Sequence, residues 1–163
     1  MMTRPMRRIR QELDQAACED ILVKNTSGVL ALSGDDGYPY AVPLSYVWAE
    51  GKLIFHGAKA GHKLDAMRRE PRASFCVIGA DDVVPERFTT HYRSVICFGR
   101  MRVIDDPAEM RRLTLLLCDK YWPGHPTEGA AEVDGAMSRL CVFVMDVERV
   151  TGKQAIELVE KES

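Results

Sequence analysis

Residues 53–71, LIFHGAKAGHKLDAMRREP, hold the pattern of residue types with the clearest chemistry in this chain. A strand-like apolar run ends in a turn with two glycines, two histidines and two lysines, and a helical pattern follows. Gly57 and Gly61 allow backbone N–H groups to approach a ligand closely, and a helix that begins near His62 adds unpaired amides. Lys63 places a point charge in the first turn of that helix. These features suit a phosphate monoester, and a solvent-exposed basic turn is the alternative interpretation.

This turn is basic although the chain as a whole is not. The 163 residues carry a formal net charge of −2, whereas residues 59–72 hold five Lys or Arg against two Asp or Glu. The positive charge is therefore local. With a pI near 6.1 and no basic stripe that carries aromatic residues, the chain is not expected to bind nucleic acid.

Other kinds of site lack a matching motif. Residues 57–63, GAKAGHK, are one residue shorter than a phosphate-binding P-loop and lack the Ser or Thr that follows its lysine. No G-x-G-x-x-G follows a strand, which disfavours a Rossmann dinucleotide site. The five cysteines are widely spaced in apolar runs without a C-x-x-C pair, so we expect reduced core thiols and no metal site.

The hydropathy of the chain bears on its location. No apolar run approaches the roughly 18 residues that span a bilayer. The first residues, MMTRPMRRIRQELDQ, are basic and then mixed, and they lack the apolar core of a signal peptide. We therefore expect a cytoplasmic protein without a membrane partner.

The elements around the basic turn follow from periodicity and turn signals. Strand-like runs occupy residues 29–33, 38–48, 53–58, 72–79, 94–104 and 140–150. Helical patterns cover residues 6–24, the segment from His62, and residues 106–121, and a Gly- and Pro-rich loop is expected at 122–135. Asp14 is expected to cap a second helix within 6–24, and Asp106 with Pro107 marks the start of the third helical pattern.

This order of elements predicts an α+β fold, a six-stranded antiparallel β-barrel with peripheral helices. We expect one domain over residues 1–163, with N-terminal helices at 6–25, the barrel at 28–150 and a C-terminal tail at 151–163. Because a barrel of six strands is filled by its own side chains, a ligand is expected on its outside or between subunits.

Three segments together carry a resemblance to a known family. Residues 39–79, PYAVPLSYVWAEGKLIFHGAKAGHKLDAMRREPRASFCVIG, resemble the flavin-binding core of the pyridoxamine-phosphate-oxidase-like FMN-binding split-barrel family. Residues 88–106, FTTHYRSVICFGRMRVIDD, and 147–158, VERVTGKQAIEL, resemble its nitroimidazole-resistance (Nim-type) subgroup. The likeness extends over about residues 7–158. It implies a split β-barrel, FMN as the cofactor, and a homodimer with FMN at the interface, each site built from both chains.

The resemblance also implies which residues bind FMN. The strand whose backbone lies along the isoalloxazine ring corresponds to Val42, Pro43, Leu44, Ser45 and Tyr46. The phosphate and ribityl chain are expected near His56, Gly57, Ala58 and Gly61, with His62 and Lys63 in the place of an Arg-Lys phosphate pair. Arg93 and Ser94 correspond to the pyrimidine edge of the flavin.

Two departures from the family shape the functional expectation. His62 replaces an arginine, so weaker or pH-dependent FMN binding is expected. The chain ends at Ser163 without the Trp- and Arg-bearing segment of the true oxidases, which disfavours pyridoxamine-phosphate oxidation. The resemblance favours an FMN-dependent oxidoreductase of small molecules, such as a nitroreductase, with His56 as the catalytic residue. A non-catalytic flavin-binding or electron-transfer protein and a haem-binding relative are the alternatives.

Overall fold

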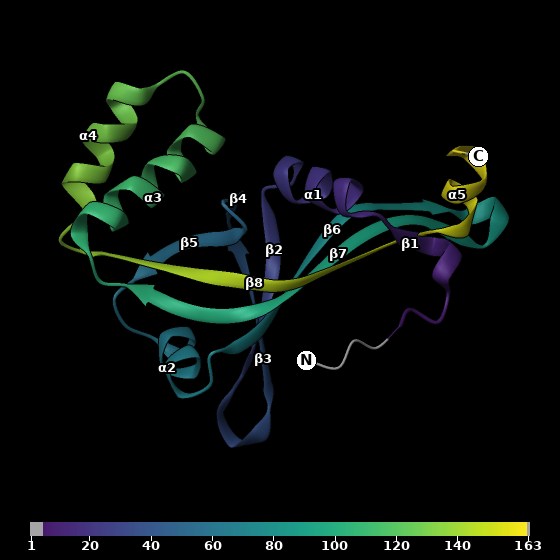
Figure 1. Ribbon diagram of the computed structural model, residues 1–163, viewed down its shortest axis with the longest axis horizontal. Helices are drawn as coiled ribbons and strands as arrows, with labels where there is room; N and C mark the ends of the chain where they lie inside the picture. Colours follow the sequence, from purple (N-terminus) through teal and green to yellow (C-terminus); the bar gives the residue numbers. More distant parts are fainter. Residues whose placement is uncertain (1–4, 163) are drawn as a thin grey trace.

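The computed structural model describes residues 5–162, whose strands form one antiparallel sheet (Figure 1). The strands are β1 Glu12–Leu13, β2 Ser27–Ser33, β3 Pro39–Ser45, β4 Val47–Ala49, β5 Lys52–Ala58, β6 Arg72–Val84, β7 Thr89–Ile104 and β8 Leu140–Gln154. They lie in the order β3, β2, β6, β7, β8, β5, β4, and β1 pairs with β8. The predicted α+β fold with an antiparallel sheet is confirmed. The structure adds the short strand β1 and divides the strand predicted at 38–48 into β3 and β4.

Helices lie around the sheet. They are α1 Gln15–Lys24, α2 His62–Arg69, α3 Pro107–Tyr121, α4 Pro126–Ala136 and α5 Ile156–Glu162, with 3-10 turns η1 Ile9–Gln11, η2 Asp35–Gly37 and η3 Pro85–Arg87. Figure 1 shows α3 and α4 side by side at one end of the sheet, near β5 and β8. At the other end β6 and β7 project as a long hairpin, with α5 beside its tip.

The helix starts follow local capping signals. The Asp14 carboxylate accepts the N–H of Ala17 at 2.8 Å, and Asp106 accepts the N–H of Glu109 at 2.8 Å. Gly61 precedes α2 with φ +131°, a conformation that favours glycine. These three predicted helix starts are confirmed.

The predicted helical structure in residues 6–13, before the helix that Asp14 caps, is wrong. Residues 9–11 form η1, and β1 pairs with β8 through Glu12 opposite Lys153 and Leu13 opposite Gly152. Gly152 allows this close packing, because a Cβ at this position would lie only 2.3 Å from the Sγ of Cys18. Pairing with β8 therefore overrides the helical periodicity of the segment.

Residues 122–135, expected to form a loop, contain most of α4. The Arg111 guanidinium of α3 binds the Asp134 carboxylate at 2.6 and 3.1 Å. Gly129 faces α3 so closely that a Cβ there would lie 3.2 Å from the Cβ of Cys118. Packing on α3 thus stabilises a helix whose glycines had indicated a loop.

Two strand boundaries also differ from the predicted ones. β8 continues to Gln154 and α5 begins at Ile156, so the sheet extends past 150 into the segment expected to be a tail. β6 and β7 are longer than the predicted runs because their outer parts pair with each other from Ala80 opposite Arg93 to Val84 opposite Thr89. This pairing builds the projecting hairpin.

The core consists of two apolar clusters separated by β5. Phe55 packs with Phe143 and the buried residues of α1 and α2, whereas Ile54 packs with Leu113 and Leu117 of α3. Successive residues of a strand face opposite sides. His56 is therefore on the α3 side of β5, and Gly57 is on the α2 side.

Burial also sets the state of the cysteine thiols. All five cysteines are free, and Cys18, Cys97 and Cys141 are buried. Burial raises the pKa of the Cys18 thiol to about 11 and that of Cys97 to about 12. Both thiols are protonated at neutral pH and behave as core residues, as predicted. Among residues 5–162, no helix is long and apolar enough to cross a membrane.

Candidate functional site

Lys63 of α2 lies directly against Gly57 of β5. A Cβ built at Gly57 would lie 3.3 Å from the Cε and 3.5 Å from the Nζ of Lys63. The absence of a side chain at Gly57 therefore leaves room for the lysine. Lys63 is partly buried, and among residues 5–162 it makes no ion pair with a carboxylate.

Two further cations approach the same place. Burial raises the pKa of the Cys141 thiol, as does the nearby negative charge of Asp105, whereas the positive charges of Arg68, Lys63 and Lys59 act in the opposite direction. Cys141 of β8 is the direct partner of Gly57 in the sheet register. The end of β5 is therefore a region of concentrated positive charge, and its chemistry fits a phosphate group.

His62 has different contacts from Lys63. Its imidazole stacks on the ring of Tyr40 in β3, with centroids 4.0 Å apart, and its Nε2 lies 3.5 Å from Oδ2 of Asp35. Asp35 also accepts a hydrogen bond from Arg69 at 2.9 Å. The structure thus places the two expected phosphate residues against different strands.

His56 lines a pocket of about 340 Å³ on the opposite side of β5. The walls come from the ends of β3 and β5, from α3 and α4, and from the start of β8; they comprise Ser45, His56, Thr114, Leu117, Cys118, Tyr121, Glu132, Val133, Ala136 and Leu140. Mostly apolar walls with a few polar groups are typical of sites for small molecules. Of the predicted residues, the structure brings Ser45 and His56 together here.

The residues from α3 and α4 were missed by sequence reasoning. Thr114 and Tyr121 belong to a helix that was predicted, but its position over His56 depends on tertiary packing. Glu132 lies in the segment that was expected to be a loop. Pro126 at the first position of α4 was the local signal for that helix.

Val42, Pro43, Leu44 and Ser45 lie on β3, the terminal strand of the sheet order. β3 pairs with β2 through Val42 opposite Leu30 and Pro43 opposite Val29, and its other edge has no strand partner within residues 5–162. Pro43 lacks an N–H group, which suits an edge strand. The free backbone edge can bind the polar rim of a planar ligand.

Tyr46 differs from the rest of that stretch, because its polar groups are used inside the protein. Its ring is buried, burial raises its pKa, and its hydroxyl donates to the carbonyl of Leu22 at 2.8 Å. Its N–H donates to the Tyr121 hydroxyl at 3.0 Å, and that hydroxyl also contacts the carbonyls of Thr26 and Tyr46. Tyr46 therefore fixes the end of β3.

Arg93 and Ser94 lie far from Lys63 in the same chain. The Arg93 Nε donates to Oε1 of Gln154 at 3.0 Å, and Ser94 lies between Ile78 and Lys153 in the sheet. β7 reaches the Lys63 end of β8 only at Ile104, about 35 Å further along the strand at about 3.3 Å per residue. One chain alone does not bring these residues to the basic cluster.

In the described part of the chain, no group of three or more His, Cys, Asp or Glu is placed to hold a metal ion.

The curved antiparallel sheet, the basic turn before α2 and the peripheral helices define a split-barrel protein. The chain belongs to the pyridoxamine 5'-phosphate oxidase family, whose sequence model matches residues 14–154. No match is found among curated proteins.

Solved structures show the same fold at low sequence identity. A conserved hypothetical protein from Mycobacterium tuberculosis superposes with a TM-score of 0.80 and 21% identity, covering 94% of this chain and 92% of the other. A candidate 5-nitroimidazole antibiotic resistance protein from Bacteroides thetaiotaomicron superposes with a TM-score of 0.75 and 20% identity, covering 88% of this chain and 86% of the other. An FAD- and haem-binding protein from Mycobacterium smegmatis superposes with a TM-score of 0.74 and 23% identity, covering 90% of this chain and 74% of the other. These likenesses confirm the split-barrel fold.

Proposed function

We propose that this protein binds FMN and catalyses redox reactions of small molecules. One observation carries the proposal: the Lys63 ammonium lies against Gly57 without a carboxylate partner among residues 5–162, and Lys59 and Arg68 lie close by. This cluster matches the charge of a phosphate monoester, which FMN carries at the end of its ribityl chain. Membership of a flavin-binding family supports the choice of ligand.

The residues of the chain have separate roles in this proposal. Lys63 binds the phosphate, and Gly57 and Ala58 lie beside it. Gly61, which has no side chain, lets the phosphate approach the N-terminus of α2. The free edge of β3, from Val42 to Ser45, binds the polar rim of the ring. His56 lines the pocket, where an imidazole N–H donates to the substrate. Leu117 and Val133 exclude water from that pocket, and bound FMN supplies the redox chemistry.

A nitro compound is the substrate class that we propose. The structural relative from Bacteroides thetaiotaomicron is a candidate 5-nitroimidazole resistance protein. The apolar pocket at His56 is large enough for a small ring, and its imidazole N–H can donate to a nitro oxygen. These two observations support a nitroreductase of the Nim-type subgroup.

The purified protein tests both parts of this proposal. We expect a flavin absorption spectrum, and released FMN rather than FAD by chromatography. Anaerobic NADH or NADPH should bleach the spectrum, and metronidazole, a 5-nitroimidazole, should restore it. His56→Ala should keep FMN and lose the second reaction. Bleaching without reoxidation by any nitro compound would instead indicate a flavin-binding or electron-transfer protein.

A haem-binding function is the second candidate. The Mycobacterium smegmatis relative binds both FAD and haem, and a cluster of Lys59, Lys63 and Arg68 also suits the carboxylates of haem propionates. A Soret band after reconstitution with haem, together with failure to bind FMN, would favour this function.

We also propose a homodimer in which each flavin site contains residues of both chains. Val29, Cys76 and Ile96 are directly paired across β2, β6 and β7, so they form an apolar row on one face of the sheet, in which Val29 and Ile96 are exposed and Cys76 is partly buried. Ser94 lies two residues from Ile96 and faces the same side. A second copy packed on this face would cover the row and supply Ser94 to a site that it does not reach in its own chain.

Light scattering tests the dimer. We expect twice the mass of the chain, and we expect Ile78→Glu with Ile96→Glu to give a monomer with weakened FMN binding, because both side chains are exposed on this face. Val23→Glu is the matched control, since Val23 is an exposed residue of α1 on another surface. A wild-type monomer that holds FMN would contradict the dimer but not the Lys63 site.

A further inference from the structure

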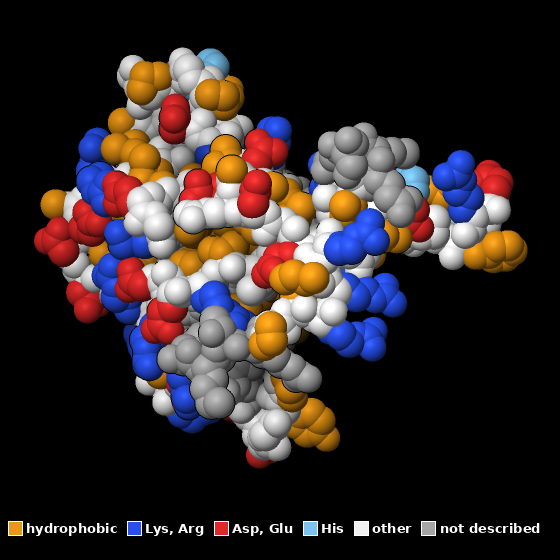
Figure 2. Space-filling model, turned by 45° about the vertical axis from the view of Figure 1, so that its right-hand side comes forward, with side chains coloured by type: hydrophobic (Ala, Val, Ile, Leu, Met, Phe, Trp, Pro, Cys, Tyr) orange, Lys and Arg blue, Asp and Glu red, His pale blue; other side chains and the backbone are white. Residues whose placement is uncertain are grey.

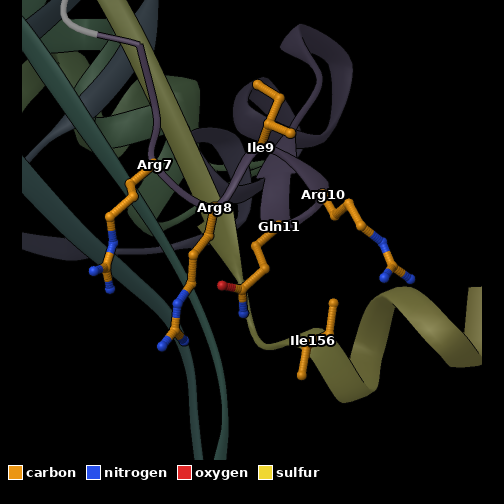
Figure 3. Close-up of a pocket in the computed structure, with 6 residues that line it drawn as sticks. All are labelled: Arg7, Arg8, Ile9, Arg10, Gln11 and Ile156. Carbon is orange, nitrogen blue, oxygen red and sulfur yellow. The ribbon is translucent and has the colours of Figure 1, made fainter.

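A second basic pocket lies at the opposite end of β8 from Lys63. It has a volume of about 440 Å³ and is lined by Arg7, Arg8, Ile9, Arg10, Gln11 and Ile156 (Figure 3). Its residues precede β1, which pairs with β8 at Lys153, whereas Cys141 at the start of β8 adjoins Lys63. The two places are about 40 Å apart along the strand at about 3.3 Å per residue. The pocket is therefore separate from the proposed phosphate site of FMN.

The arginines of this pocket have no acidic partners within the part of the chain that the structure describes. Several arginines elsewhere are neutralised: Arg102 binds Asp146 at 2.6 Å, and Arg111 binds Asp134 at 2.6 Å. Figure 3 shows the side chains of Arg7 and Arg8 extending in the same direction. Two neighbouring guanidinium groups without carboxylates favour a phosphate, which they can bind through paired N–H donors.

Gln11 adds an independent indication of a ligand. Its side chain is only 4% exposed, and its Oε1 is buried without a hydrogen-bond partner within residues 5–162. Figure 3 shows its amide between Arg8 and Ile156. A buried acceptor without a donor is costly, so a ligand that donates an N–H or O–H here would be stabilised.

The apolar residues of the pocket limit the ligand further. Ile9 is 63% exposed although it is a large apolar side chain, and Ile156 lies on the other side of Gln11. Figure 2 shows hydrophobic and basic side chains next to one another on the projecting part of the molecule. The ligand therefore needs an anionic group, a hydrogen-bond donor and an apolar body.

We propose that this pocket binds a nucleoside phosphate. Arg7 and Arg8 bind its phosphate, Oε1 of Gln11 accepts an N–H of the base or an O–H of the ribose, and the base packs against Ile9 and Ile156. The flat face of a base also stacks on guanidinium groups. Inorganic phosphate has no apolar group to pack against Ile9 and Ile156, and a peptide of acidic residues has no planar group to stack on the guanidinium groups. The inference does not depend on flavin binding at Lys63.

Calorimetric titration of the full chain with adenosine 5'-monophosphate tests the inference. Binding should be at least about tenfold tighter than that of inorganic phosphate or adenosine, because only the nucleotide uses both halves of the pocket. Arg8→Ala should weaken binding about tenfold through loss of a charge-assisted contact. Arg139→Ala is the control, since Arg139 is an exposed arginine outside the pocket whose ion pair with Glu132 is long at 4.0 Å. Tighter binding of a poly-glutamate peptide than of the nucleotide would contradict the proposal.

Two more measurements separate this pocket from the Lys63 cluster. Saturating FMN, which would occupy the Lys63 cluster, should leave the affinity for adenosine 5'-monophosphate unchanged. Loss of nucleotide binding in the presence of FMN, with retention in Arg8→Ala, would overturn the inference. Gln11→Leu removes a buried acceptor that lacks a partner, so the variant should fold and bind inorganic phosphate like the parent. It should bind adenosine 5'-monophosphate several-fold more weakly, and an unchanged affinity would contradict the role of Gln11.

Discussion

The imidazole of His62 stacks on the ring of Tyr40 at a centroid distance of 4.0 Å, with 18° between the ring planes. Lys63, the next residue, instead lies against Gly57 of β5. Neighbouring residues of a helix point about 100° apart, so α2 directs these two side chains to different strands. His62 therefore connects α2 to β3, and Lys63 remains available to an anion.

Lys63→Ala should weaken FMN binding by about tenfold or more, because a hydrogen bond to a charged group contributes about 1.5–3 kcal/mol. Riboflavin, which lacks the phosphate, should bind both proteins equally. Quenching of flavin fluorescence measures both affinities. Lys24→Ala is the matched control, since Lys24 pairs with Asp20 on the surface of α1. Equal FMN affinity in the parent and Lys63→Ala would show that the phosphate lies elsewhere.

His62→Ala should change FMN affinity less than about threefold, because the contacts of His62 are with Tyr40 and Asp35. It should lower the free energy of unfolding by about 1 kcal/mol through loss of the stacked pair. Urea unfolding and the same flavin titration separate the two effects. If the variant loses as much FMN affinity as Lys63→Ala, His62 binds the phosphate as the family resemblance implies.

The fold was largely predictable because its signals are local. Asp14 and Asp106 mark helix starts, and Glu50 with Gly51 adopts the positive φ angles of the tight turn between β4 and β5. Errors occurred where tertiary pairing competes with a local pattern. Glu12 and Leu13 pair with β8 instead of continuing a helix, and Gly129 is accommodated in α4 by its contact with α3.

The site was predictable only in part. Gly57, Gly61 and Lys63 lie close together in the sequence and predict an anion site, and the structure places Lys63 against Gly57. Sequence spacing does not show that Tyr121 and Ser45 line one pocket, because these two residues are 76 positions apart and meet only after folding. It also does not show that Arg93 lies at the far end of the sheet.

Glu70 should make stability depend on pH at acid pH. The Arg72 guanidinium and N–H donate to its carboxylate at 2.6–3.0 Å and lower its pKa from 4.5 to about 2. Because the folded pKa lies below the unfolded one, this stabilisation is present above about pH 4.5 and is lost as the pH falls to about 2. Glu70→Gln should be less stable than the parent at pH 7, and the difference should disappear near pH 2 in urea unfolding. Glu86→Gln, in the η3 turn, is the control, and a pH-independent difference would contradict the ion pair as its cause.

Tyr121→Phe should destabilise the protein by about 1–3 kcal/mol, because it leaves the Tyr46 N–H without its acceptor. The ring is retained, so the change tests the hydroxyl alone. Chemical unfolding measures the loss, and Tyr38→Phe, at a side chain that is 75% exposed, is the matched control. A change within about 0.5 kcal/mol, the range of ordinary surface substitutions, would show that the hydroxyl does not stabilise the end of β3.

Two glycines of α4 should respond differently to alanine. Gly135 has open space around its missing Cβ, so Gly135→Ala should stabilise the protein by about 0.5–1 kcal/mol through helix propensity. Gly129→Ala gains the same propensity but places a Cβ 3.2 Å from the Cβ of Cys118, which forces α3 and α4 apart. In thermal unfolding, Gly135→Ala should therefore have a higher melting temperature than Gly129→Ala. Equal stabilisation would show that the helices are not in close contact at Gly129, and no effect at Gly135 would show that this segment is not helical.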